Sequence, residues 1–103
     1  ITMNFDSLVA NLTPLAESMR GAEESAIAQY TPIVESILRN RSRDVRHIER
    51  TLDALVDLSG HPVGLQLFRR LCRHYWDIDP AATAEYVLIY RNTWHDETEE
   101  VKP

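Results

Sequence analysis

The sequence has one cysteine, three glycines and five prolines, and Lys102 is its only lysine. With Cys72 alone the chain cannot form an internal disulfide, and this usage is typical of a reducing compartment. No apolar run approaches the roughly 20 residues that a membrane-spanning helix needs. The start of the sequence also lacks the charged and then apolar pattern of a signal peptide. We therefore expect a cytoplasmic protein without a membrane segment.

The composition is that of a helical globular domain. The 103 residues suit one domain, and 44% hydrophobic with 26% charged residues is ordinary for such domains. Strand-forming residues are scattered rather than alternating. The prediction is an all-α fold, a compact bundle of four to five helices in a single domain over residues 1–95. The acidic segment 96–103 is predicted to be a disordered tail.

One or two helices are expected between residues 6 and 39. The segment can begin at Asn4, Asp6 or Ser7, each a good N-cap residue. Its apolar residues then follow at helical spacing: Leu8, Val9, Leu12, Leu15, Ala16 and Met19. Pro14 predicts a boundary or kink, since proline lacks a backbone donor. Thr31 and Pro32 resemble an N-cap and a first helical residue, and predict a new helix there.

A heptad-like seam of apolar residues runs through residues 32–58. Its members are Val34, Leu38, Val45, Ile48, Leu52 and Leu55, with Arg41 as the one polar interruption. Residues 40–44 are all polar, and Ser42 is able to cap a second helix. A break near residues 40–43 is therefore favoured over one continuous helix.

The best-supported helices are residues 44–58, 63–76 and 80–95. Gly60 suits the left-handed position that ends many helices, and Pro62 suits the first turn of the next. Asp79 followed by Pro80 repeats the start signal of a cap and a first-turn proline. The four-residue connection between the first two helices predicts an antiparallel or steeply crossed pair.

No pattern for chemistry stands out from this background. The sequence contains neither HExxH nor CxxC spacing. Cys72 lies on an apolar stripe, which is typical of a buried packing residue. Cys72 and His74 are two residues apart and face different ways on a helix, whereas His74 and Asp77 have a spacing that could supply two metal ligands. Further ligands would have to come from His47, His61 or His95. We therefore expect no catalytic residue, no metal, no cofactor and no enzymatic activity.

The formal net charge of −5 hides a basic middle between acidic ends. The simplest interpretation is charge pairing between packed helices. An alternative is a basic patch that binds nucleic acid, if the two arginine-rich helices are neighbours. The residues of this patch would be Arg39, Arg43, Arg46, Arg50, Arg69, Arg70 and Arg73. The acidic overall balance counts against that alternative.

Aromatic residues gather in the last third of the chain. Tyr86, Tyr90 and Trp94 follow one another at helical spacing, and Trp76 ends the preceding helix. An aromatic ridge of this kind most often packs in the core, and the alternative is a homodimer or partner surface, where Tyr and Trp are enriched. The helix 80–95 is apolar almost all round, a pattern typical of a central helix or of one shared with another subunit. The leading hypothesis is a small non-enzymatic protein-interaction module. It would self-associate, as a homodimer, through its C-terminal aromatic helix.

Overall fold

The computed structural model describes the backbone of residues 4–94, and the side chains of residue 4 and of residues 21–94. It has four helices, α1 (Phe5–Asn40), α2 (Val45–Leu58), α3 (Pro62–Trp76) and α4 (Pro80–Trp94). No strand occurs between residues 4 and 94. The predicted all-α class and helical bundle are therefore confirmed, with four helices. The predicted tail 96–103 lies outside the described residues.

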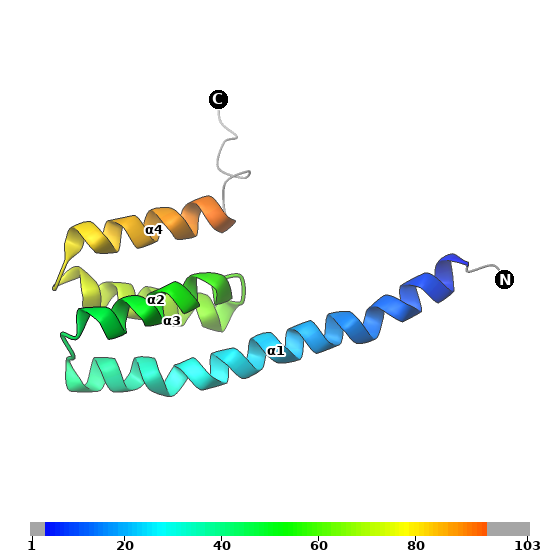
Figure 1. The fold of residues 1–103 in the computed structure, drawn as a ribbon, viewed down its shortest axis with the longest axis horizontal. Coiled ribbons are helices and arrows are strands. Elements are labelled where there is room, and N and C mark those ends of the chain that lie inside the picture. Colours follow the sequence, from blue (N-terminus) through cyan, green and yellow to red (C-terminus); the bar gives the residue numbers. More distant parts are fainter. Residues whose placement is uncertain (1–3, 95–103) are drawn as a thin grey trace, which may run out of the picture.

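The hairpin of α2 and α3 forms the centre of the bundle. The last part of α1 packs against one side of this hairpin, and α4 covers the opposite side (Figure 1). The first half of α1 projects beyond the bundle (Figure 1). This projection gives a radius of gyration of 17.7 Å, whereas a compact domain of this length has about 13 Å.

The buried core comes mainly from α2 and α3. Its most completely buried side chains are Val34, Ile48, Leu52, Leu55, Leu71 and Tyr75. The described part of α1 enters this core from Ile27 onward. In α4 only Thr83 is buried, so this helix is half-covered rather than central.

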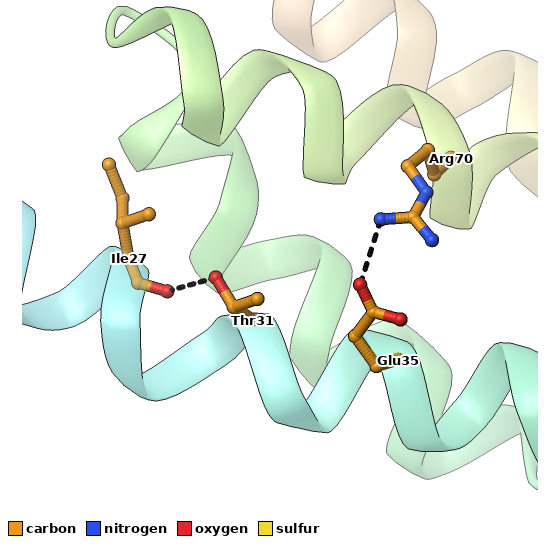
Figure 2. Close-up of polar contacts among 4 residues, drawn as sticks. All are labelled: Ile27, Thr31, Glu35 and Arg70. Atoms are coloured by element: carbon orange, nitrogen blue, oxygen red, sulfur yellow. Dashed lines mark hydrogen bonds and ion pairs between the residues drawn. The ribbon is translucent and has the colours of Figure 1, made fainter.

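Helix α1 differs from two predictions that were based on its proline residues. It continues without interruption through Pro14 and Pro32. The helix start predicted at Pro32 is therefore wrong, and of the boundary or kink predicted at Pro14 the boundary does not occur. The Thr31 hydroxyl does not cap a helix but donates to the Ile27 carbonyl at 2.7 Å (Figure 2). Such a bond to the preceding turn is a common alternative for threonine inside a helix.

The predicted break near residues 40–43 is confirmed, and it is made by a Schellman motif. The Ser42 amide donates to the Ile37 carbonyl at 3.0 Å, and the Arg41 amide donates to the Leu38 carbonyl at 3.2 Å. Arg41 has a φ of 52° and so occupies the left-handed region. Helix α2 is capped by Asp44 rather than by the predicted Ser42, since the Asp44 carboxylate accepts from the His47 amide.

Replacing Arg41 with glycine is expected to raise the free energy of unfolding by about 1 kcal/mol, because only glycine adopts the left-handed conformation without a steric penalty. Urea denaturation followed by circular dichroism measures this difference. Arg43→Gly is the matched control, since Arg43 lies in the same connection and has no positive φ. The control is expected to be neutral or destabilising. A destabilised Arg41→Gly variant would contradict the expected strain.

Two further connections fix the relative positions of α2, α3 and α4. Gly60 does not adopt the predicted left-handed conformation, since no glycine between residues 4 and 94 has a positive φ. It instead makes room for Trp94, whose ring would lie 2.8 Å from a Cβ at this position. The predicted start of α4 is confirmed, because the Asp79 carboxylate accepts from the Ala82 amide at 3.0 Å.

Candidate functional site

The inner face of α4 holds this helix on the bundle through aromatic side chains. The rings of Tyr90 and Phe68 lie 5.6 Å apart between their centroids. The indole N–H of Trp94 donates to the Val56 carbonyl at 2.9 Å. The Tyr86 hydroxyl donates to the Asp53 carboxylate at 2.9 Å. The structure therefore places Tyr86, Tyr90 and Trp94, which the sequence marked as an interaction surface, in contact with α2 and α3.

The outer side of α4 carries an apolar surface that the sequence did not single out. Val87, Leu88 and Ile89 are 46%, 53% and 47% exposed. Successive residues of a helix are about 100° apart, so these three are spread over about 200° of the helix, and the exposed Glu85 lies on the same outer side as Leu88 and Ile89. We call Val87, Leu88 and Ile89 the α4 surface. The signal in the sequence was that this helix is apolar almost all round. Because its aromatic residues face the bundle, some of its aliphatic residues face outward.

An apolar groove lies beside the α4 surface, between α3 and α4. It has a volume of about 470 Å³ and is lined by Leu65, Phe68, Arg69, Cys72, Arg73, Trp76, Thr83, Val87 and Tyr90. Trp76 is 51% exposed and belongs to the predicted surface residues. Arg69 and Arg73 are exposed and contribute the only charged groups of the lining. The groove and the α4 surface meet at Val87.

Cys72 lies in the groove lining but has no nucleophilic character. Burial raises the pKa of the Cys72 thiol from its ordinary value of 9.0 to about 12, so the thiol is protonated at neutral pH. His74, the nearest histidine in the sequence, instead makes a 2.7 Å hydrogen bond between its Nε2 and the Ser42 carbonyl oxygen. Among the side chains of residues 4 and 21–94, no group of three His, Cys, Asp or Glu is arranged to hold a metal ion.

Two tyrosine–carboxylate pairs connect the helices behind the groove. The Tyr75 hydroxyl on α3 donates to the Glu49 carboxylate on α2. Burial, followed by this hydrogen bond, raises the pKa of Tyr75. Burial and the hydrogen bond to Asp53 likewise raise the pKa of Tyr86. These pairs join α2 to α3 and α4, and they account for the polar atoms that would otherwise be buried without partners.

The arginines of the predicted basic patch are spread over α1, α2, α3 and the connection between α1 and α2. Arg46 and Arg50 lie on α2, and Arg69, Arg70 and Arg73 lie on α3. Arg39 lies in the last turn of α1. Arg43 lies in the connection from α1 to α2 and lines a hollow together with His74 and Asp77 at the end of α3.

Two of these arginines form ion pairs within the bundle. The guanidinium of Arg70 lies 3.2 Å from the Glu35 carboxylate on α1 (Figure 2). The guanidinium of Arg73 lies 3.2 Å from the carboxylate of Asp77, four residues later in the sequence. Both pairs are exposed, so each stabilises the fold by less than about 1 kcal/mol. They agree with the interpretation that basic and acidic segments partly neutralise one another.

Comparisons with protein-family models, with curated proteins and with solved structures gave no match to this chain. Within the part of the chain that the structure describes, no helix combines the length and the apolar character that crossing a membrane requires.

Proposed function

We propose that this protein is a non-enzymatic helical interaction module that self-associates through its C-terminal helix. The observation that carries this proposal is the α4 surface, three consecutive aliphatic residues each about half exposed, beside an apolar groove. Exposed apolar surface of this kind commonly marks a protein-binding site. The groove also offers the residue types that dominate binding energy, an exposed tryptophan and arginines at the rim.

The groove suits a helix better than a small molecule. It runs between two helices of about equal length and is open along its side, the geometry in which an amphipathic helix is bound. The α4 surface then extends the contact beyond the groove. A nucleic-acid function has less support, because two of the arginines already pair with carboxylates and the overall charge of the chain is acidic.

Val87→Asp is expected to weaken self-association at least tenfold, because a carboxylate would be buried in an apolar interface. Light scattering over a range of protein concentrations measures the mass. Val63→Asp is the matched control, since Val63 is 44% exposed but lies outside the groove lining. The association of the wild-type protein is expected to persist at high salt, as apolar contacts do. A wild-type monomer at all concentrations, or equal effects of the two substitutions, would overturn the proposal.

A further inference from the structure

We infer that the segment bound in the groove is the N-terminal arm of α1, residues 5–20, from a second copy of this chain. The two copies would exchange arms, so that each arm lies in the groove of the other copy. This inference rests on the proposed function, because it names the partner of the same groove. It draws on the position of the arm, on its sequence and on its match to the groove.

The arm is a helix that leaves its own bundle. Figure 1 shows its ribbon extending past the ends of α2, α3 and α4, with no other described helix beside it. A Cβ added at Gly21, directly after the arm, would meet nothing within 4 Å. The described part of α1 joins the core only from Ile27 onward. The backbone of the arm therefore has no described helix beside it.

A helix in this position gains from support outside the chain. Isolated helices shorter than about 12–15 residues are marginal in water even when their sequences are favourable. Pro14 adds a cost of about 3 kcal/mol in a helix interior, and Gly21 adds about 1 kcal/mol. The arm and its junction contain both residues. Packing against another molecule would offset these costs.

The sequence of the arm provides a surface for such packing. With 3.6 residues per turn, its larger apolar residues fall on one stripe of the helix and its charged residues on the remainder. The stripe consists of Phe5, Leu8, Val9, Leu12, Leu15, Ala16 and Met19. An amphipathic helix with this pattern is the kind of segment that an apolar groove binds.

The arm and the groove also agree in length and in charge. At a rise of 1.5 Å per residue, residues 5–20 are about 24 Å long and the helices that form the groove are about 22 Å long. Asp6 and Glu17 against Arg20 give the arm a formal charge of −1, and Glu23 and Glu24 follow shortly after. Arg69 at the groove rim makes no ion pair among the described side chains, so it is available to an acidic partner.

A second copy satisfies both surfaces with one arrangement. Each chain has one arm and one groove, and a twofold axis would produce two equivalent contacts between two copies. This reciprocity doubles the buried area relative to a single helix in a groove. The competing arrangements are pairing of groove with groove, pairing of arm with arm, and binding of the acidic segment 96–103 in the groove.

A mixing experiment separates these arrangements. The variant Leu12→Asp damages the arm, and Val87→Asp damages the groove. Each variant alone is expected to be monomeric at concentrations where the wild-type protein is dimeric. An equimolar mixture of the two is expected to form heterodimers, because it retains one intact arm and one intact groove. Native mass spectrometry of differently tagged chains distinguishes heterodimers from homodimers.

Ala10→Asp is the matched control for the arm. It adds the same charge on the polar side of the same helix and is expected to leave the dimer unchanged. Hydrogen exchange provides a second readout that follows the arm directly. In the Val87→Asp variant the amides of residues 5–20 are expected to lose their protection, although the sequence of the arm is unaltered.

The outcomes distinguish this inference from the proposed function. If Val87→Asp disrupts the dimer and Leu12→Asp does not, the groove mediates self-association but the arm is not its partner. If Leu12→Asp disrupts the dimer and Val87→Asp does not, arms pair with arms and the proposed groove function fails. Two monomeric variants without heterodimers in the mixture would overturn the exchange of arms.

Discussion

Replacing Gly64 with alanine is expected to lower the free energy of unfolding by about 3 kcal/mol or more. Gly64 lies in the first turn of α3, where the chain returns after α2, and it is buried. A Cβ at this position would lie 2.0 Å from the Leu58 carbonyl oxygen and 2.8 Å from the carbonyl carbon. These are backbone atoms, so no change of rotamer relieves the overlap. The ends of α2 and α3 would have to separate, and the core between them would open.

Gly21→Ala is the matched control for this prediction. It makes the same substitution in a helix, but at a site where the new Cβ meets nothing within 4 Å. Alanine favours a helix over glycine by up to about 1 kcal/mol, so this variant is expected to be slightly more stable than the wild-type protein. Thermal unfolding followed by circular dichroism measures both. At about 4–8 °C per kcal/mol, Gly64→Ala is expected to unfold more than 10 °C below the wild-type protein. Equal melting temperatures for the two variants would contradict the steric argument.

The helix boundaries were predictable wherever the local sequence favoured only one structure. Asp79 followed by Pro80 begins a helix in the sequence and in the structure, because an extended aspartate and a first-turn proline favour the same backbone path. The polar run near residue 41 likewise ended α1 as predicted. Thr31 with Pro32 looked equivalent but is internal to α1. There the threonine hydroxyl donates to a carbonyl in the preceding turn. Val34 and Ile37 also pack against the hairpin of α2 and α3, and local capping rules do not include the free energy of such tertiary contacts.

The candidate site was only partly predictable for a related reason. The sequence identified α4 as unusually apolar, and it named Trp76, which lines the groove. It did not show which side of α4 faces the bundle, since a helix that is apolar all round has no marked direction. The contact between the partly buried Tyr90 and the buried Phe68 settles that direction in the structure.

Three groups with raised pKa values make the protein sensitive to alkaline conditions. Burial raises the pKa of Cys72 from 9.0 to about 12, and it also raises the pKa of Tyr75 and of Tyr86 from 10.0. Each group is neutral when protonated, so the folded state retains protons that the unfolded state releases. The stabilisation is fully present below pH 9 and is lost as the pH rises through the folded pKa values. For Cys72, a difference of one pKa unit corresponds to about 1.36 kcal/mol, so the free energy of unfolding falls by at most about 4 kcal/mol between pH 9 and pH 12.

Urea denaturation between pH 8 and pH 11 is therefore expected to show a steady fall in the free energy of unfolding above pH 9. The Cys72→Ala variant is expected to be less stable than the wild-type protein at pH 8, because it leaves a small cavity, but to lose less stability between pH 9 and pH 11. Tyr75→Phe is expected to reduce the slope in the same way above pH 10. A slope that both substitutions leave unchanged would show that neither group carries the alkaline transition. A reduced slope would show that the Cys72 thiol and the Tyr75 hydroxyl lose their protons at a higher pH in the folded than in the unfolded protein, as their burial predicts.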